Sequence, residues 1–426
     1  MRHTKKDGIA YSVFPFGHSR QMFLVGEPDE HYSCEDGPDY PRQIRALLEN
    51  VTAVCEKEGF VDNAAGMCHV FIKDIGKREL VWQLADELCR QKDEALCSFF
   101  GAVTFVPQAP ASGAAVSIEI WAMSGEKPHF KVEDEKHRPR QGQRVVAEFD
   151  DMKWFFGGGC QPDQTAPSLI GAYNRSKSAF DMLEMLLREP DFPFDQLLRT
   201  WIYQGHLVLD EGNTQRYKEL NRARTDAFGD TQFLKDYLPK DYKGVVYPAS
   251  TGIGADDFDI VMSAVALDTK RKDVIAVPLE NPNQTSAFDY GAVYSPQSPK
   301  FSRAMAVAMD DTCLIFVSGT ASITDSESRY PEDPVKQTEQ TLDNIAALID
   351  DENLSRHGIP DIACKLDNLV CVRVYVKRRS EFEVIRQVCE RRLPKVPILY
   401  TVADVCRPEL LVEIEGVAVA CKPPRI

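Results

Sequence analysis

Apolar positions follow one another along this chain in an order that occurs three times. Each copy contains a short apolar run that ends in glycine, at residues 22–26 (MFLVG), 154–159 (WFFGGG) and 315–319 (IFVSG). Short apolar runs rich in β-branched and aromatic residues are typical of buried strands. The pattern therefore predicts a strand early in each copy.

A polar loop then leads, in each copy, to residues with the spacing of an amphipathic helix. Apolar side chains three and four positions apart lie on one helix face, which is expected to be buried. They are Ile44, Leu47, Leu48, Val51 and Val54 in the first copy, Phe180, Met182, Leu183, Leu186 and Leu187 in the second, and Leu342, Ile345, Leu348 and Ile349 in the third.

Three further elements complete each copy. A second strand is expected at 67–72, 197–203 and 369–376, and a second helix at about 77–90, 214–228 and 380–391. The final strands, 117–124, 259–266 and 413–420, align without gaps, so that Ile118, Ile260 and Ile414 coincide. Strand, helix, strand, helix, strand describes an α/β unit.

The repeats divide the chain into three units of one kind. We expect a first unit at 1–126, a polar linker at 127–143 that crosses the surface, a second unit at 144–275 and a third at 276–426. A length of 426 residues agrees with two or three domains, because one domain usually takes about 150 residues. The alternative is three unrelated α/β domains.

Composition narrows the class of protein. Asp and Glu outnumber Lys and Arg by 65 to 50, a net charge of −15, which argues against nucleic acid as a partner. The basic start lacks the apolar core of a secretory signal, and no apolar run approaches the ~18 residues of a membrane span. The twelve cysteines include no C-x-x-C pair, so we expect reduced thiols in a cytoplasmic protein without a metal.

The final strands differ in their chemistry. They carry Ser117, Asp259 and Glu413 at one aligned position, and only the third copy has the sequence Glu-Ile-Glu. Glu413 and Glu415 are two apart and share one face of a strand. Burial of a carboxylate raises its pKa, which suits a general acid. We expect this role for Glu413 and a structural role for Glu415; the alternative is a solvated edge strand.

The third copy resembles the YjgF/RidA family, also described as endoribonuclease L-PSP. The matching segments are FVSGTASI (316–323), QTEQTLDNI (337–345), VCVRVYVK (370–377) and VEIEGVAV (412–419). The resemblance implies an α/β (α+β) fold of three tandem RidA-like units that form an intrachain pseudo-trimer, with sites in the clefts between units. The arginine typical of RidA deaminases is missing from 396–401, which disfavours imine deamination.

Copies two and three together resemble the chorismatases, which include chorismate hydrolases and 3-hydroxybenzoate synthases. The likeness covers roughly residues 150–422. It rests on LLRTWIY (197–203), QRYKELNRARTDAF (215–228), PASTGIG (248–254), ENPNQTSAFDY (280–290), SPKFSRA (298–304) and ADVCRPELLVEIE (403–415). It implies an enzyme that needs no cofactor and uses two fused RidA-like halves.

The resemblance also implies site residues. Glu413 matches the catalytic glutamate, and Cys406 matches a position that influences the product, where cysteine goes with the 3-hydroxybenzoate type. Arginines bind carboxylates in pairs of hydrogen bonds. The remaining candidates for substrate binding are Arg224, Arg303, Arg407, Gln284, Tyr294 and the small residues Ser250, Thr251 and Gly252, for which the alternative is a plain turn.

The central motif departs from the chorismatase pattern, which reads approximately NPRQVSAYRYP. The replacing residues are Asn283, Phe288, Gly291, Ser295 and Gln297. Loss of an arginine and of a tyrosine hydroxyl removes potential contacts to an anionic substrate. The expected substrate is therefore chorismate or a related small cyclic carboxylate.

These observations lead to one hypothesis and two alternatives. The hypothesis is cleavage of an enolpyruvyl ether by Glu413, through protonation and water attack, in the cleft between copies two and three. The alternatives are a RidA-like enamine or imine deaminase and a non-catalytic protein that binds small carboxylates. Since one chain supplies all the clefts, a monomer or homodimer is expected.

Overall fold

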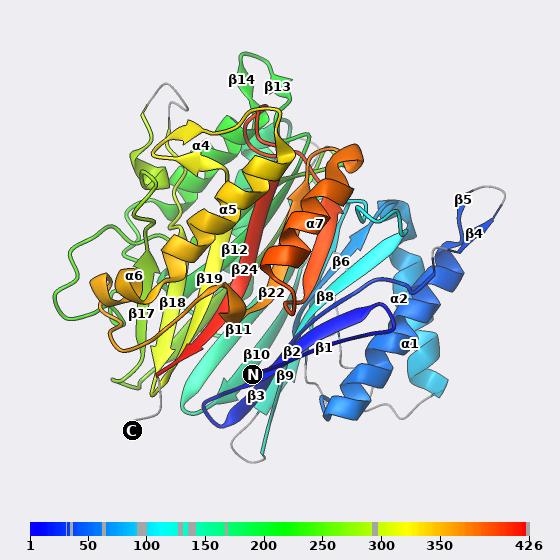
Figure 1. Cartoon of the computed structure of the whole chain (residues 1–426), viewed down its shortest axis with the longest axis horizontal. Coiled ribbons are helices and arrows are strands. Elements are labelled where there is room, and N and C mark those ends of the chain that lie inside the picture. Colours follow the sequence, from blue (N-terminus) through cyan, green and yellow to red (C-terminus); the bar gives the residue numbers. More distant parts are fainter. Residues whose placement is uncertain are drawn as a thin grey trace.

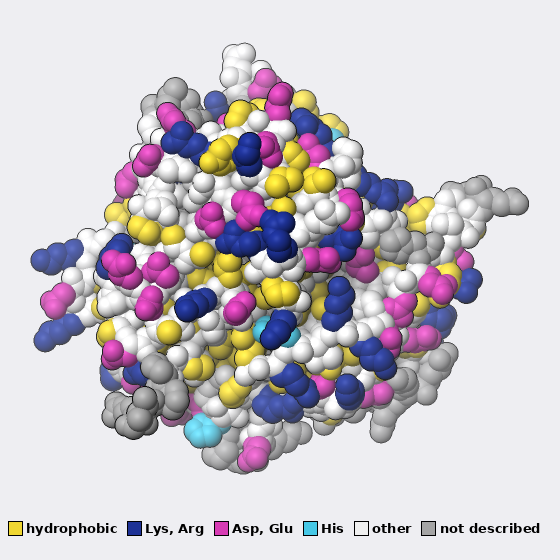
Figure 2. Space-filling view, in the orientation of Figure 1, with side chains coloured by type: hydrophobic (Ala, Val, Ile, Leu, Met, Phe, Trp, Pro, Cys, Tyr) yellow, Lys and Arg dark blue, Asp and Glu magenta, His cyan; other side chains and the backbone are white. Residues whose placement is uncertain are grey.

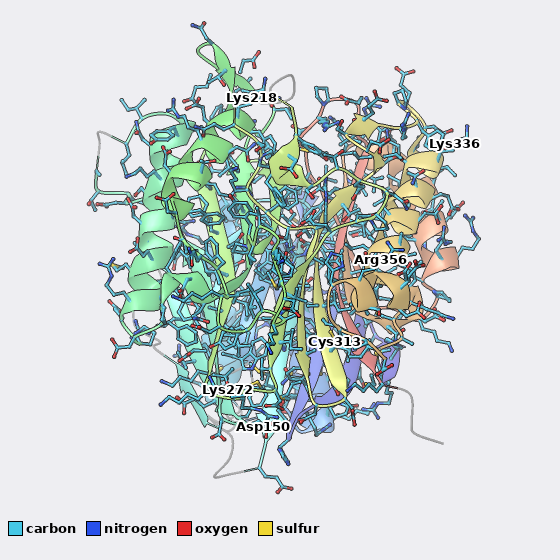
Figure 3. All side chains as sticks on the ribbon, turned by 90° about the vertical axis from the view of Figure 1, so that its left-hand side faces the viewer. Asp150, Lys218, Lys272, Cys313, Lys336 and Arg356 are labelled. Carbon is cyan, nitrogen blue, oxygen red and sulfur yellow. The ribbon has the colours of Figure 1, made fainter. Side chains whose placement is uncertain are left out.

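The structure, a computed structural model, describes residues 1–30, 32–34, 37–61, 65–91, 100–126, 131–134, 142–166, 169–291 and 297–422. Three six-stranded sheets form its centre and the longer helices lie outside them (Figure 1). The expected mixed α/β architecture is confirmed. Turning the molecule by 90° shows the helices of its second and third parts on opposite sides of the central strands (Figure 3).

The first sheet has the order β1-β2-β3-β8-β6-β7. Its strands are β1 (Arg2–Lys6), β2 (Ile9–Phe16), β3 (Ser19–Gly26), β6 (Ala65–Ile72), β7 (Ala102–Val106) and β8 (Val116–Gly125). The same part of the chain contains helices α1 (Tyr40–Glu58) and α2 (Arg78–Gln91). It also contains a short hairpin formed by β4 (Ser33–Cys34) and β5 (Gly37–Pro38).

The second sheet repeats that order as β9-β10-β11-β16-β12-β15. Its strands are β9 (Lys131–Asp134), β10 (Gln143–Phe149), β11 (Met152–Cys160), β12 (Leu197–Gly205), β15 (Ala249–Ala255) and β16 (Ile260–Thr269). The helices are α3 (Ala172–Arg188) and α4 (Arg216–Phe228), and a hairpin pairs β13 (Asp210–Glu211) with β14 (Thr214–Gln215).

The third sheet follows the same order, β17-β18-β19-β24-β22-β23. Its strands are β17 (Ile275–Leu279), β18 (Ala304–Met309), β19 (Thr312–Ala321), β22 (Leu369–Val376), β23 (Ile398–Val402) and β24 (Val412–Cys421). The helices are α5 (Pro334–Ile349), α6 (Asp351–Arg356) and α7 (Phe382–Arg392), and the hairpin joins β20 (Ile323–Thr324) to β21 (Glu327–Ser328).

The structure corrects one expectation about connections and excludes one alternative. The segment 127–143 is not simply a linker, because β9 lies within it and pairs with β10 as the edge of the second sheet. The glycine-rich stretch PASTGIG is not a turn. It enters β15, which pairs in parallel with β12, so tertiary pairing overrides the low strand propensity of its glycines.

Local sequence explains where the helices begin. The Asp39 side chain accepts a hydrogen bond from the Arg42 backbone amide at the start of α1, and Asp333 does the same with Lys336 at the start of α5. Such caps satisfy amides that have no partner inside the helix. Helix α1 ends at Gly59, whose φ of 74° lies in the left-handed region that favours glycine.

The three sheets close into a ring. The parallel edge strand of each sheet contacts the next one: β7 meets β11, β15 meets β19, and β23 meets β3. One apolar core joins the inner faces of all three sheets. At its centre the Trp121 ring lies 5.8 Å from Trp154, 5.0 Å from Phe156 and 5.6 Å from Phe316. Each sheet therefore needs the other two to bury its inner face.

The outer surface and the cysteines complete the description. Acidic and basic side chains are interspersed over the face shown in Figure 2. Within the described ranges, none of the helices has the length and apolar content needed to traverse a bilayer. Among the cysteines that the structure describes, ten are free thiols, most of them buried. Cys89 is disulfide-bonded, so the expectation of reduced thiols is wrong for that residue.

Candidate active site

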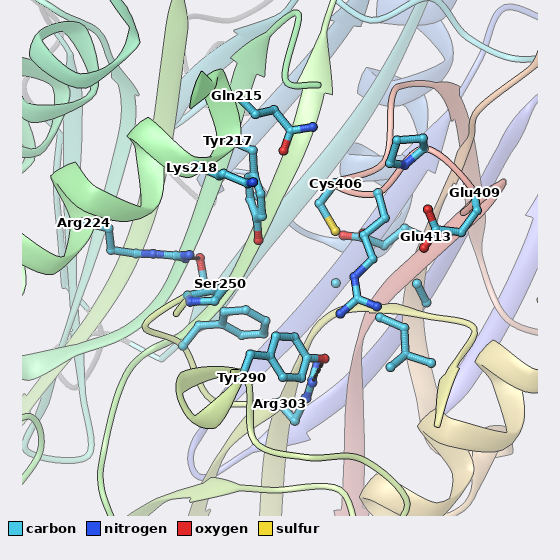
Figure 4. A pocket seen from close by; sticks show the side chains of 18 residues that line it. Gln215, Tyr217, Lys218, Arg224, Ser250, Tyr290, Arg303, Cys406, Glu409 and Glu413 are labelled. Carbon is cyan, nitrogen blue, oxygen red and sulfur yellow. Dashed lines mark hydrogen bonds between the residues drawn. The ribbon is translucent and has the colours of Figure 1, made fainter. Parts of the chain in front are cut away.

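A cavity of about 310 Å³ lies where the second and third sheets meet. Helix α4 and strand β15 line it from the second part of the chain, and the ends of β19 and β24 line it from the third. Figure 4 shows Tyr217, Lys218 and Arg224 on one side of it, with Cys406 and Glu413 on the other. Its volume is at the lower end of the ~300–1,000 Å³ of small-molecule sites.

Glu413 is the acidic group buried in this cavity. It lies on β24 opposite Ala321 of β19 and Tyr375 of β22, and only 5% of it is exposed. Burial raises its pKa to about 8, with the nearby Glu415 charge adding to the effect and two arginines opposing it. At neutral pH the carboxyl therefore holds a proton and is able to donate it.

Gly319 provides the space that the Glu413 side chain occupies. A Cβ atom at position 319 would lie 2.1 Å from Glu413 Oε1 and 3.0 Å from Thr251 Cγ2. No real Cβ approaches that closely, so any side chain here would displace the acid. The glycine at the end of the predicted strand 315–319 is thus part of the site.

Glu415 has a different environment although it lies only two residues away. It does not line the cavity and is 3% exposed. Arg199 Nη2 donates to its Oε2 at 2.5 Å, and Arg373 Nη1 lies 2.7 Å from its Oε1. Thr251 donates to Oε2, and the Trp201 indole donates to Oε1 at 3.1 Å. These partners hold Glu415 in place behind the cavity.

The same network reaches the first sheet. Arg373 donates to Glu119 at 2.6 and 3.2 Å, and its Nη2 lies 3.3 Å from the Nδ1 of His69. Burial and the two arginines hold the pKa of His69 well below its usual range. A buried ion pair costs desolvation unless its hydrogen bonds are satisfied. Here the two buried arginines and two glutamates largely satisfy one another at the meeting point of the three sheets.

Arg224 and Arg303 bring buried positive charge to the cavity. Arg224 donates to Asn221 at 2.5 Å and to Ser250 at 3.3 Å, while Arg303 donates to the Tyr290 hydroxyl at 2.6 Å. Neither forms an ion pair with a described residue, and the buried Nε of each lacks a hydrogen-bond partner there. The Glu280 carboxyl, which accepts a hydrogen bond from the Arg303 backbone amide at 3.3 Å, is close enough to interact with the Arg303 charge. Two buried guanidinium groups that lack a direct ion pair favour a ligand with negative charge.

Arg407 adds a third positive charge. Its Nη1 donates to the Ser326 carbonyl at 2.8 Å and to the Ser328 hydroxyl at 3.2 Å. Its guanidinium lies 5.3 Å from the centre of the Tyr290 ring, a cation–π distance. These contacts fix the side chain beside the cavity.

Cys406 lines the cavity as a neutral thiol. Burial raises its pKa to about 12, and the neighbouring Glu413 contributes to the increase. The thiolate is the reactive form of cysteine, and none of the described lining residues is a histidine that would generate it. The environment therefore suits an apolar wall and not a nucleophile.

The other predicted residues divide into two groups. Ser250 and Gly252 line the cavity, whereas Thr251 between them points to the opposite side of β15, as alternation along a strand requires. Gln284 does not line it either, but donates to the carbonyl of Ile323, which does. Tyr294 lies outside the described residues.

The departures from the family motif fall away from the cavity wall. Asn283, Phe288, Gly291 and Gln297 do not line it, and Ser295 lies outside the described residues. Phe288 instead packs against Tyr247, with ring centres 5.6 Å apart. None of the described replacing side chains therefore forms part of the cavity wall.

Two lining tyrosines were missed from the sequence. Tyr217 precedes Arg224 by seven residues, which is close to two helical turns and places both on one face of α4. Tyr290 closes the motif at 280–290 and holds Arg303. The spacing of seven residues from Arg224 was a sequence signal that could have identified Tyr217. Tyr290 gave no such signal, because its position in the cavity depends on contacts made across a loop.

Known proteins resemble this chain in sequence and in structure. The endoribonuclease L-PSP family model matches residues 296–420. A 3-hydroxybenzoate synthase of Streptomyces hygroscopicus is 31% identical over 306 residues, which cover 70% of this chain and 80% of the relative. A chorismatase of the same organism is 34% identical over 239 residues, covering 54% and 63%.

A crystal structure of a chorismatase shares the fold. It superposes with a TM-score of 0.61 at 21% identity and covers 84% of this chain and 93% of its own. The sequence likeness extends over most of both chains, and the matching motifs converge on one cavity. The chain therefore belongs to the family of the chorismatases and 3-hydroxybenzoate synthases.

Proposed function

We propose that this protein cleaves the enolpyruvyl ether of chorismate, or of a closely related cyclic dicarboxylate, in the cavity between its second and third units. The observation that carries the proposal is a protonated, buried Glu413 in a cavity that also contains two arginines without an ion pair. An acid and two cations match an enol ether with two carboxylates.

The reaction begins with proton transfer. The Glu413 carboxyl donates its proton to the terminal carbon of the enolpyruvyl group, which leaves an oxocarbenium ion and a carboxylate. The carboxylate then accepts a proton from water as the oxygen attacks the cationic carbon. Collapse of the resulting hemiketal breaks the ether bond and releases pyruvate and a ring alcohol, so Glu413 regains its proton.

Arg224 and Arg303 hold the two carboxylates of the substrate in this proposal. Their pairing with the substrate replaces water and places the vinyl carbon near Glu413. Cys406 shapes the wall beside the ring. A cysteine here supports 3-hydroxybenzoate as the final ring product, which forms when the diene diol left by hydrolysis loses water, its C4 hydroxyl leaving together with the C3 proton as the ring becomes aromatic. We also propose a cytoplasmic monomer or homodimer, with units at 1–126, 144–275 and 276–426.

The test is turnover of chorismate by the full chain. Pyruvate release is followed in a coupled assay, and mass spectrometry identifies the ring product. We expect activity in the wild type and a loss of at least ~100-fold in Glu413→Gln, which keeps the shape but has no acidic proton. Glu352→Gln on the exposed face of α6 is the control and should retain full activity.

Two results would contradict the proposal. Equal rates for wild type and Glu413→Gln would exclude the acid, and ammonia release from an enamine without pyruvate release from chorismate would favour the deaminase alternative.

A further inference from the structure

Strand β19 carries a β-bulge at the wall of the cavity. Between Val317 and Thr320, two residues of β19 lie opposite a single residue of β24. The two are Ser318 and Gly319, and the residue opposite them is Glu415. A bulge takes backbone groups out of the regular ladder of the sheet, and when they are buried they need other partners.

The Gly319 amide finds its partner on the neighbouring unit. It donates to the Thr251 hydroxyl of β15 at 2.9 Å. The same hydroxyl accepts from Arg199 Nη2 at 2.5 Å and donates to Glu415. A hydroxyl has one donor and two acceptor sites, so this one is fully used. Because Thr251 is almost fully buried, solvent does not replace these bonds if the hydroxyl is lost.

Ser318 joins the same bulge to one of the cavity arginines. Its backbone amide donates to the Arg303 carbonyl at 2.9 Å, and its hydroxyl donates to the Ser302 carbonyl at 2.6 Å. The Ser250 amide of β15 donates to that hydroxyl at 2.9 Å. Strand β15 therefore holds both residues of the bulge, one with a backbone amide and one with a side chain.

The position of the bulge determines the space that the acid has. A Cβ atom at position 319 would meet both Glu413 Oε1 and Thr251 Cγ2, so Gly319 is packed between these two side chains. A displacement of its backbone toward the cavity would close the space of the Glu413 carboxyl. The hydroxyl and the methyl group of Thr251 oppose such a displacement from the side of the second unit.

A comparable hydrogen bond occurs between the first and second sheets. Strand β11 has a bulge of its own, where the Gly159 amide donates to the Thr104 hydroxyl of β7 at 2.9 Å. The acid of that interface is Asp259, which aligns with Glu413 and is held by Arg175 at 2.9 and 2.5 Å. The same type of support is therefore present beside an acid that is already neutralised.

We propose that Thr251, which belongs to the second unit, is a positioning residue for the acid of the third unit: it fixes the bulge of β19 at Gly319 and so keeps open the space from which Glu413 donates its proton. This inference rests on the proposed function of the cavity. Thr251 acts through Gly319 and does not touch the substrate.

The test compares two replacements of Thr251 in the full chain, with kcat calculated per folded molecule from near-UV circular dichroism. Thr251→Val keeps the shape but removes all three hydrogen bonds, whereas Thr251→Ser keeps the hydroxyl. Thr251→Val should lower kcat for pyruvate release by at least ~10-fold and change KM by less than ~3-fold, because a misplaced acid weakens the transition state and not substrate binding. Thr251→Ser should remain within ~3-fold of the wild type in both constants.

Thr104→Val is the matched control. It removes the corresponding hydrogen bond at the interface without a free acid, so it should lower the Tm and leave kcat within ~2-fold of the wild type. A purely structural role of Thr251 predicts this same result for Thr251→Val. If Thr251→Val does not fold, Thr251→Cys takes its place and should show a smaller loss of kcat, since a thiol is a weaker donor and acceptor.

A second readout does not need turnover. The carboxyl band of Glu413 is identified in infrared difference spectra against Glu413→Gln and is followed from pH 5 to pH 10. In Thr251→Val its titration midpoint should fall by at least ~1 pH unit, because a loosened bulge admits water and reduces the cost of the charged form. Thr251→Ser and Thr104→Val should titrate like the wild type.

The inference is overturned if Thr251→Val keeps either the kcat or the Glu413 midpoint of the wild type, or if Thr104→Val loses as much turnover. A wild type that releases no pyruvate from chorismate contradicts the proposed function instead. The midpoint in Thr251→Val then decides the positioning role by itself.

Discussion

Glu413 and Glu415 show how far two identical side chains on one strand diverge. Both are almost fully buried on β24, two positions apart. Glu415 is held by Arg199 and Arg373, whereas Glu413 has no ion pair among the described residues and its pKa rises to about 8. Both carboxyls are equally buried, so the difference comes from their charged neighbours. Two arginines keep Glu415 ionised, whereas Glu413 lacks such a partner among the described residues and holds its proton at neutral pH.

The pH dependence of turnover should report the protonation of Glu413. Its donor form predominates below its pKa of about 8, so the kcat/KM for chorismate should be level below pH 7 and fall by about tenfold per unit above pH 8. Initial rates of pyruvate release between pH 6 and 10 measure this. A rate that rises through pH 8 would mean that Glu413 acts first as a base.

The same group should make the fold less stable as pH increases. Its pKa is about 8 when folded and near 4.5 when exposed, so between these values only the unfolded chain loses the proton. The free energy of unfolding then falls by up to about 1.4 kcal/mol per pH unit. Glu413→Gln should weaken this slope in urea unfolding at pH 5 and pH 8; an unchanged slope would contradict the raised pKa.

At the scale of elements, two strands determine which side chains reach the cavity. Alternation along β15 sends Ser250 and Gly252 toward it and Thr251 away, to Glu415. Between Val317 and Thr320 the pairing of β19 with β24 shifts register, and Gly319 lies in this irregular stretch. The bulge and the missing side chain together leave room for Glu413.

Gly319→Ala tests this packing. Its Cβ would meet Glu413 Oε1 and Thr251 Cγ2, so we expect a destabilisation of roughly 1–3 kcal/mol from overpacking and a large loss of turnover. Gly291→Ala is the matched control, because a Cβ there would meet nothing within 4 Å. Thermal unfolding and pyruvate release give the two readouts. If both variants behave alike, the close approach at Gly319 is not important.

At the scale of the whole molecule, closure of three sheets into a ring creates both the core and the clefts. Trp121 contacts aromatic rings of the second and third sheets, and the Glu119–Arg373–Glu415 network crosses the same interfaces. Neither is available to a single sheet. The chain should therefore unfold as one cooperative unit.

Trp121→Ala should destabilise the whole chain and not one part of it. Removal of a large buried aromatic costs roughly 3–5 kcal/mol, so we expect a lower Tm with a single transition. Trp82→Ala, at a partly exposed position on α2, is the control and should cost less. Separate transitions for different parts of the chain in calorimetry would contradict the shared core.

Much of the fold was predictable because its signals are local. Apolar spacing located α1, α3 and α5 and the strands that follow them, since a buried face repeats every three or four residues. The edge strands β9 and β15 were missed, because their pairing comes from neighbouring strands and not from their own composition. Glu413, Arg224 and Arg303 were found through motifs; Tyr290 was not.

The sequence by itself determined the repeated elements and the family, and it singled out Glu413 as a candidate acid, because each is encoded in spacing or in a short motif. Only the tertiary structure decided that Thr251 faces away from the cavity and that Glu415 is neutralised by two arginines. These facts depend on which strands pair across the ring and on which charges become neighbours. Burial and electrostatic partners are properties of that arrangement, and no single segment of the sequence contains them.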